Sequence, residues 1–190
     1  MTVATWTPPV VATSAGKAAR GVRLTPPALY AEIERRYGGG GFDIDAASAR
    51  ELALAPRYFC ADHCALEHRW TLFMARARDW PLDEWRPAPS HAARVFVNPP
   101  YDAIKPWVEK AKEEVDRDDV DRVVMLLPAR TSSAWFTWAI ERGARAVFLR
   151  HRVRFLDVKR RPLSRPFEHS MLLIFETPFD VRAFNGGAAG

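Results

Sequence analysis

A short apolar stretch that runs straight into two prolines constrains this chain more than any other feature. Residues 95–97 are β-branched or aromatic, a composition that favours a buried strand. Asn98, Pro99, Pro100 and Tyr101 follow directly. Because proline has no N–H to give to a sheet ladder and fixes its own φ, the strand must end in a stiff, extended turn. The sequence therefore predicts an amide and an aromatic ring on a rigid loop at the carboxyl end of a strand, where open α/β sheets bind ligands.

The residues of this loop suit one kind of chemistry. The side-chain oxygen of Asn98 and the carbonyl of Pro99 can together accept both hydrogens of an exocyclic amine, which frees the nitrogen lone pair for an electrophile. Tyr101 offers a flat face on which a planar base can stack. The loop resembles the catalytic motif of S-adenosylmethionine-dependent amino-methyltransferases, so we predict Asn98, Pro99, Pro100 and Tyr101 as catalytic residues. The alternative is a plain Pro-Pro turn after a strand.

Length and composition limit the remaining possibilities. A chain of 190 residues suits one domain, which we expect over residues 24–182, between a flexible arm (1–23) and a flexible tail (183–190). We expect a cytoplasmic protein, because no apolar run is long enough to span a membrane and no secretion signal is visible. The net charge of +5 and a pI of about 9.6 are consistent with a polyanionic partner.

The order of periodic segments predicts an α/β fold with a Rossmann-like sheet. We expect a helix after Thr25 (its N-cap) and Pro26, another from about Ala49, and further helices over residues 104–115 and 133–140. Strands are expected at 42–45, 95–97, 122–127 and 146–149, followed by a hairpin that pairs the arginine-rich segment 150–155 with 170–175. The sheet should be mostly parallel, with an antiparallel strand near 171–175.

The first strand-to-helix turn is a candidate ligand site. Asp43 and Asp45 end the expected strand, and the small residue Ala46 follows. Acidic side chains at a strand end can hold a cofactor's ammonium or ribose hydroxyl, and small residues let the backbone approach a ligand. An isolated aspartate in this place is more often a cap, but an Asn-Pro-Pro-Tyr loop downstream strengthens the ligand interpretation.

Several motifs in order resemble the phage DNA adenine-N6 methyltransferase family. They are Thr25-Pro26, residues 42–47, residues 56–59, Asn98-Pro99-Pro100-Tyr101, residues 126–131, Trp135-Phe136 and residues 152–155. The resemblance covers roughly residues 25–176, with 70–93 as an insertion. It implies a class I methyltransferase fold, S-adenosylmethionine as cofactor and adenine in double-stranded DNA as substrate. It also implies that Thr25, Pro26, Asp43, Asp45, Ala46, Asp62 and Asn98 bind the cofactor.

Cysteine and histidine side chains cluster around Asp62. Cys60, His63, Cys64 and His68 lie within a few positions of it. Zinc sites usually draw their ligands from two separated elements, and side chains crowded into one short segment could hardly close a tetrahedron. We therefore predict no metal site.

Basic residues follow two of the expected strands. Arg130 comes at the end of the strand at 122–127, where it is either a surface charge or a phosphate contact. Further along are Arg150, Arg152 and Arg154, whose alternation would place them on one face of a strand, and then Lys159 and Arg160 in a basic loop. A solvated strand is the alternative, but beside a motif for a nucleobase amine we predict that these residues bind DNA.

The sequence therefore predicts an enzyme that transfers methyl from S-adenosylmethionine to the N6 amine of an adenine flipped out of duplex DNA. Three alternatives remain open: methylation of cytosine N4, methylation of a protein glutamine, and a basic DNA-binding module that keeps the fold without activity. A monomer is the simplest expectation for the oligomeric state.

Overall fold

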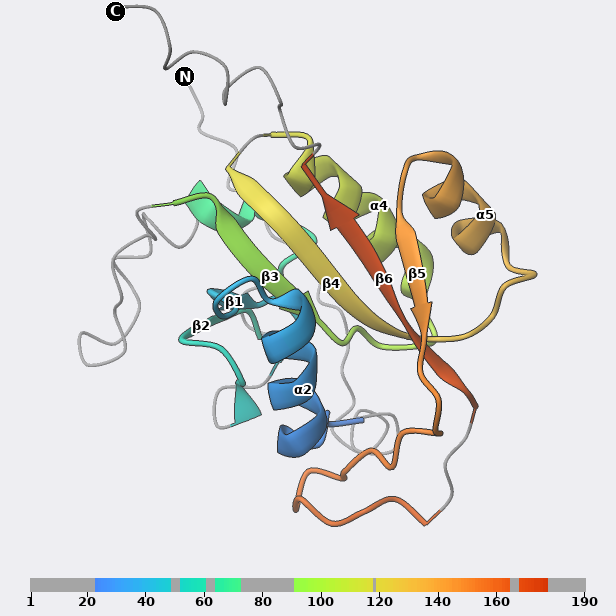
Figure 1. Cartoon of the computed structure of the whole chain (residues 1–190). Coiled ribbons are helices and arrows are strands. Elements are labelled where there is room, and N and C mark those ends of the chain that lie inside the picture. The colour runs from blue at the N-terminus through green and yellow to red at the C-terminus, as the bar shows by residue number, and fades with distance from the viewer. Residues whose placement is uncertain are drawn as a thin grey trace, which may run out of the picture.

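The hydrophobic strand that ends at Val97 lies inside a mixed sheet. In the computed structural model, which describes residues 23–48, 52–60, 64–72, 91–117, 119–164 and 168–177, the strand order is β2-β1-β3-β4-β6-β5 (Figure 1). The strands are β1 (Ile44–Asp45), β2 (Arg57–Tyr58), β3 (Ala93–Val97), β4 (Val120–Pro128), β5 (Arg145–Phe148) and β6 (Ser170–Glu176). The helices are α2 (Pro27–Tyr37), α4 (Ile104–Val115) and α5 (Ala134–Glu141).

The directions of the strands confirm the α/β fold expected from the sequence. β1 pairs in parallel with both β2 and β3, and β3 pairs in parallel with β4, with Val95 opposite Val123. β6 is inserted between β4 and β5 and runs antiparallel to both. The sheet is thus mostly parallel, and its antiparallel strand contains residues 171–175 as predicted.

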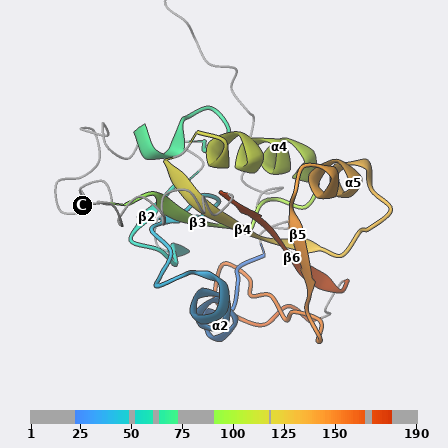
Figure 2. The same cartoon turned by 45° about the horizontal axis from the view of Figure 1, so that its top comes forward.

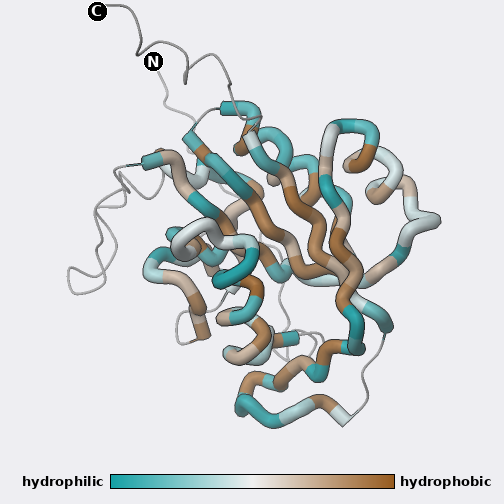
Figure 3. Tube along the Cα trace, in the orientation of Figure 1, coloured by the Kyte–Doolittle hydropathy of each residue, from teal (hydrophilic) through white to brown (hydrophobic). Residues whose placement is uncertain are grey.

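The helices cover the sheet on both faces. Figures 1 and 2 show α4 and α5 on one face and α2 on the other. Alternate strand residues belong to two separate apolar clusters: Val95 and Val123 pack in the cluster of α4, whereas Phe96 and Val124 pack in the cluster of α2. Figure 3 shows the apolar colour concentrated along the central strands. Because side chains alternate across a strand, the continuous apolar run of β4 fills both clusters at once.

Two of the expected helix boundaries are wrong. Thr25 does not cap the first helix: Pro26 occupies the N-cap position of α2, and no side chain caps the helix. The helix expected from about Ala49 falls partly on residues 49–51, outside the described part, and residues 54–56 form a bend instead of an α-helix. This bend is needed because β2 begins at Arg57, only a short distance along the chain.

The strand expected over residues 150–155 is also wrong. β5 ends at Phe148, which pairs with Met171, and the N–H of Leu149 makes a last bond to the carbonyl of Ser170. β6 begins at Ser170, so the described residues offer no further ladder against which residues 150–155 could pair. The segment therefore leaves the sheet as irregular chain.

Other predictions concern parts of the chain that the structure does not describe. Outside the described residues lie the arm up to residue 22, Asp62, most of the insertion (73–90), the last residues of the expected domain (178–182) and the tail (183–190). Of the helices in the described part, none has the length and apolar character needed to cross a membrane.

Candidate active site

The Asn-Pro-Pro-Tyr turn lies at the point where the sheet reverses its winding. From β1 the chain moves outward to β2, then returns to β3 on the other side of β1 and continues to β4. Such a switch point opens a crevice beyond the carboxyl ends of the two central strands. Ala46 follows β1 there and donates its N–H to the carbonyl of Phe96 at 2.9 Å, two residues before Asn98. The structure therefore brings the predicted residues Ala46 and Asn98 to one place.

The side chain of Asn98 is held in one orientation. Its amide nitrogen donates to the carbonyl of Arg23 at 2.6 Å and to the hydroxyl of Thr25 at 3.1 Å. Its amide oxygen is buried and has no hydrogen-bond partner among the described residues. A buried acceptor without a partner is costly, by about 1–3 kcal/mol. It is therefore a candidate for binding a donor group of a ligand.

The ring of Tyr101 is fixed on several sides. Its hydroxyl donates to the carbonyl of Leu126 on β4 at 3.2 Å, and its ring meets Phe155 edge-on at a centroid distance of 5.9 Å. Burial raises the pKa of the Tyr101 phenol above its usual value, so the hydroxyl stays protonated and remains a donor. The guanidinium of Arg23 lies over the ring, 5.0 Å from its centroid. The face of Tyr101 is thus already used by a flat, planar group.

Residues 23–25 form a strap across this site. Leu24 and Leu156 exchange two backbone hydrogen bonds, each of 2.9 Å. On one side of Leu24 the strap supplies the Arg23 carbonyl, and on the other the Thr25 hydroxyl, both to Asn98. Pro26 then leads into α2. The sequence placed Arg23 in the flexible arm, whereas the structure places it in contact with two predicted catalytic residues.

The two aspartates of β1 have different environments. Asp45 ends the strand and is buried; its carboxylate accepts the N–H groups of Leu54 at 3.2 Å and Ala47 at 3.5 Å. Burial raises the pKa of Asp45 to about 6, although these hydrogen bonds act in the opposite direction. Asp43 lies before the strand, and its carboxylate accepts the N–H of Arg94 at 2.9 Å. Asp45 thus organises the loop beside Asn98, whereas Asp43 joins β1 to the start of β3 and is not brought to Asn98.

Arg130 lies at the rim beside Tyr101. Its guanidinium donates twice to Glu168, at 2.9 and 2.5 Å, and once to the backbone carbonyl of Tyr101 at 3.4 Å. The pair lowers the pKa of the Glu168 carboxyl, chiefly through the hydrogen bond from Arg130. The sequence pattern gave no sign of Glu168, because a partner so distant along the chain leaves no local signal.

The basic segment leaves the sheet at the same edge as Asn98. Arg152 and Arg154 are exposed while Val153 and Phe155 between and after them are buried, so the predicted alternation is correct although the segment is not a strand. Arg150 is exposed as well.

A tight turn shapes the loop that follows. Asp157 accepts the N–H groups of Lys159 and Arg161, both at 2.9 Å, and Arg160 adopts a positive φ of 59° at the tip. Lys159 and Arg160 are exposed. The turn is therefore pre-formed, and the Arg161 guanidinium within it pairs with Asp157 at 2.8 Å.

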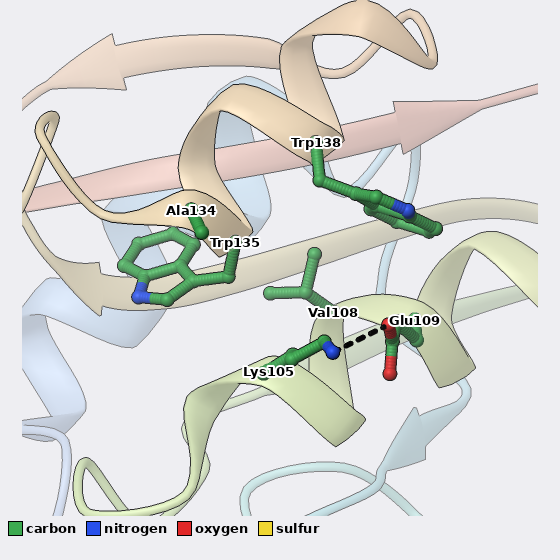
Figure 4. A pocket seen from close by; sticks show the side chains of 6 residues that line it. All are labelled: Lys105, Val108, Glu109, Ala134, Trp135 and Trp138. Atoms are coloured by element: carbon green, nitrogen blue, oxygen red, sulfur yellow. Dashed lines mark ion pairs between the residues drawn. The ribbon is translucent and has the colours of Figure 1, made fainter.

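An apolar groove lies elsewhere, between α4 and α5. Figure 4 shows the two tryptophans of α5, Trp135 and Trp138, on either side of Val108, with the ion pair of Lys105 and Glu109 on α4. None of the predicted site residues lines it. The candidate site is therefore the carboxyl edge of the sheet rather than this groove.

The chain thus combines a mostly parallel α/β sheet with an Asn-Pro-Pro-Tyr turn at its switch point. The chain belongs to the DNA N-6-adenine-methyltransferase (Dam) family, whose model matches residues 12–184. It is 29% identical over 137 residues to a DNA N-6-adenine-methyltransferase of Escherichia phage T1. The match covers 72% of this chain but 48% of that relative, so the chain spans about half the length of the curated relative it matches.

One solved structure resembles the chain more loosely. It is a Pyrococcus horikoshii protein assigned as an RNA methyltransferase, with a TM-score of 0.42, 13% identity, and coverage of 79% of this chain and 82% of that one. A likeness of this size carries no information about function.

Proposed function

We propose that this protein transfers a methyl group to the exocyclic N6 amine of adenine in DNA, with S-adenosylmethionine as donor. The observation that carries the proposal is the Asn98 amide, whose N–H groups are held by the strap while its oxygen is buried without a partner among the described residues. An acceptor fixed in this way suits an amine that has two hydrogens to donate. Membership of the Dam family favours adenine over cytosine as the base.

The chain's own residues suggest how the amine is activated. The base must leave the duplex, because its amine is otherwise paired, at a cost of a few kcal/mol. The base would stack on Tyr101 in place of the Arg23 guanidinium that now lies over the ring, and the position of the ring is set by Leu126 and Phe155. The Asn98 oxygen and the carbonyl of the buried Pro99 accept the two amine hydrogens, which keeps the nitrogen lone pair free. Pro100 stiffens the turn that carries them.

The carboxyl ends of β1 and β3 are suited to S-adenosylmethionine. Small side chains at residues 46–48 follow β1 and let a ligand approach the backbone, while Asp45 holds the shape of that loop through Ala47 and Leu54. Ala46 and Asp45 would line the cofactor from β1, and Pro26 would do so from the start of α2. The bound cofactor supplies the electrophilic methyl group. On methylation N6 sheds one proton, which the Asn98 oxygen can hold in a hydrogen bond until it passes to water, because an amide oxygen is too weak a base to keep it.

The arginine-rich segment supports double-stranded DNA as the partner. Arg150, Arg152 and Arg154 are exposed, and none of them pairs with an acidic side chain elsewhere in the described part. Lys159 and Arg160 continue the basic surface on the turn shaped by Asp157. Arginines without an acidic partner, as Arg150, Arg152 and Arg154 are within the described residues, gain most from releasing the counterions of a phosphate backbone. Arg130 would reach a phosphate only in competition with Glu168.

The direct test is a transfer assay with radiolabelled S-adenosylmethionine and unmodified duplex DNA, followed by nucleoside analysis of the digest. We expect label in N6-methyladenine with the wild-type protein and none above background with Asn98→Ala. Label in N4-methylcytosine would agree with the proposed amine chemistry but refute adenine as the methylated base. Cofactor binding without any labelled nucleoside would refute DNA as the substrate, and no cofactor binding would refute the enzyme.

The DNA-binding surface has a separate test. For the double variant Arg152→Gln/Arg154→Gln, we expect the slope of log K for duplex DNA against log salt concentration to become less steep by about two, one for each phosphate contact removed. Arg35→Gln is the matched control, because Arg35 is paired with Glu32 on α2. An unchanged slope in the double variant would place the DNA on another surface.

A further inference from the structure

Thr25 is a buried polar residue that does not do what its position suggests. A threonine just before a helix normally caps it, but α2 has no side-chain cap, and the Thr25 side chain turns the other way. Only 6% of Thr25 is exposed, and its hydroxyl lies 3.1 Å from the amide nitrogen of Asn98. A buried hydroxyl directed at the predicted catalytic amide calls for an explanation beyond helix capping.

The orientation of the Asn98 amide decides whether it can work. Its two ends have nearly the same shape but opposite hydrogen-bonding character. With the oxygen toward the substrate it accepts hydrogens from an amine; turned over, it would place a donor against a donor. The Arg23 carbonyl, 2.6 Å away, can only accept, so the nitrogen of the amide must face it. The Thr25 hydroxyl provides an acceptor for the second N–H.

We propose that Thr25 is a positioning residue for Asn98: its hydroxyl, together with the Arg23 carbonyl, occupies both N–H groups of the amide and fixes the oxygen toward the methyl-accepting amine. This inference rests on the function proposed above and adds the N-terminal strap to the site. It differs from the sequence prediction, in which Thr25 binds the cofactor.

The strap is held firmly enough for this role. The paired backbone bonds between Leu24 and Leu156 fix it from one side, and the Pro26 carbonyl accepts the N–H of Tyr30 in the first turn of α2 at 3.0 Å. Tyr30 and Phe155 belong to the same buried cluster, and Phe155 contacts Tyr101. The strap and the Tyr101 ring are therefore supported by one apolar core, which couples the orientation of the amide to the position of the ring.

The test compares Thr25→Val, which removes the hydroxyl and keeps the branched shape, with Thr25→Ser, which keeps the hydroxyl. We expect Thr25→Val to lower kcat about tenfold, the size of one hydrogen bond that matters in the transition state. The Kd for S-adenosylmethionine should stay unchanged, and Thr25→Ser should restore most of kcat. Thr177→Val is the matched control, because the Thr177 hydroxyl donates to the Val120 carbonyl at 3.1 Å, at the other end of the sheet.

Each contrary outcome overturns the proposal in a different way. An unchanged kcat in Thr25→Val would show that the hydroxyl does not position the amide. A weaker Kd for the cofactor at unchanged kcat would make Thr25 a cofactor contact. If Thr25→Ser had a kcat as low as that of Thr25→Val, the effect of both variants would come from lost packing rather than from the hydroxyl. A wild-type protein that methylates no DNA, yet binds the cofactor, would refute the proposed function before the variants are compared.

A second variant tests the Arg23 carbonyl and does not depend on Thr25→Val folding. Asn98→Asp places a carboxylate oxygen where the amide nitrogen now donates, 2.6 Å from that carbonyl, so two acceptors oppose each other. We expect Asn98→Asp at neutral pH to lower kcat on the order of a hundredfold and to lower the melting temperature, because a carboxylate then faces a carbonyl oxygen with no hydrogen between them. Full activity in Asn98→Asp would overturn the proposal, because the strap's carbonyl would then impose no orientation.

Discussion

Replacing Asp45 by asparagine should change how the stability of the fold responds to pH. Asp45 is buried at the carboxyl end of β1, and its pKa is raised from an ordinary 3.8 to about 6, with burial as the main cause. Asparagine has nearly the same shape and no titrating proton. It keeps one acceptor for the N–H groups of Ala47 and Leu54 and loses the other, at a cost of about 1 kcal/mol that does not depend on pH.

The sign and size follow from proton linkage. Because the pKa of Asp45 is higher in the folded state, the folded state binds more protons between the two pKa values, and stability falls as pH rises. A shift from 3.8 to about 6, at 1.36 kcal/mol per unit, corresponds to about 3 kcal/mol. This stabilisation is present below about pH 4 and is lost as pH rises through 6. The wild-type protein should therefore lose about 3 kcal/mol over this range that Asp45→Asn does not lose.

The measurement is urea unfolding of both proteins at several pH values between 4 and 7.5. Other carboxyl groups with lowered pKa values, such as Glu168, are common to both proteins and cancel in the difference. Asp116→Asn, at a side chain that is 58% exposed, is the control for replacing an aspartate by asparagine. A wild-type minus Asp45→Asn difference that stays constant with pH would refute the buried, proton-linked carboxylate.

Three further predictions concern the candidate site and the surface beside it. Tyr101→Phe loses only the hydrogen bond to Leu126 and should lower kcat/KM for DNA by less than tenfold. Tyr101→Ala should lower it by about a hundredfold, because stacking on an aromatic ring contributes about 1–3 kcal/mol per base. Equal effects of the two variants would show that the base does not stack on Tyr101. Glu168→Gln should strengthen DNA binding several-fold at low salt, measured by fluorescence anisotropy, because Arg130 loses its anionic partner; weaker binding would show that the pair itself shapes the interface. Asp157→Asn should strengthen DNA binding several-fold at low salt without changing the Kd for S-adenosylmethionine, because the amide oxygen still accepts the N–H groups of Lys159 and Arg161 while the Arg161 guanidinium loses its anionic partner; unchanged DNA binding would exclude the turn from the interface.

Local chemistry allowed the sequence to predict a good part of the fold. Proline disrupts a sheet ladder regardless of its surroundings. The end of β3 and the turn that carries Asn98 and Tyr101 could therefore be predicted without knowledge of the rest of the chain. The continuous apolar run of β4 likewise predicted burial on both faces of the sheet, and residues 123–128 are all buried in the structure. The alternation of exposed Arg152 and Arg154 with buried neighbours was also visible, because it needs only an extended backbone.

Boundaries that depend on a partner could not be predicted in this way. The segment at 150–155 has strand-like composition, but a strand needs a neighbour, and β6 supplies none beyond Ser170. Thr25 is a residue type that often caps helices, yet its hydroxyl accepts a hydrogen bond from Asn98, 73 positions further along the chain. Both errors come from a contact that is remote in sequence.

The sequence by itself determined which chemical groups stand at the carboxyl ends of the strands, because residue type and proline geometry are local properties. Only the tertiary structure decided which of these groups meet and which way they point. The strand order brings Ala46 beside the Asn98 turn and leaves Asp43 at the start of β3. The pairing of Leu24 with Leu156 carries Arg23 and Thr25 to the amide of Asn98. The direction of that amide depends on acceptors from a distant part of the chain, and no local pattern contains it.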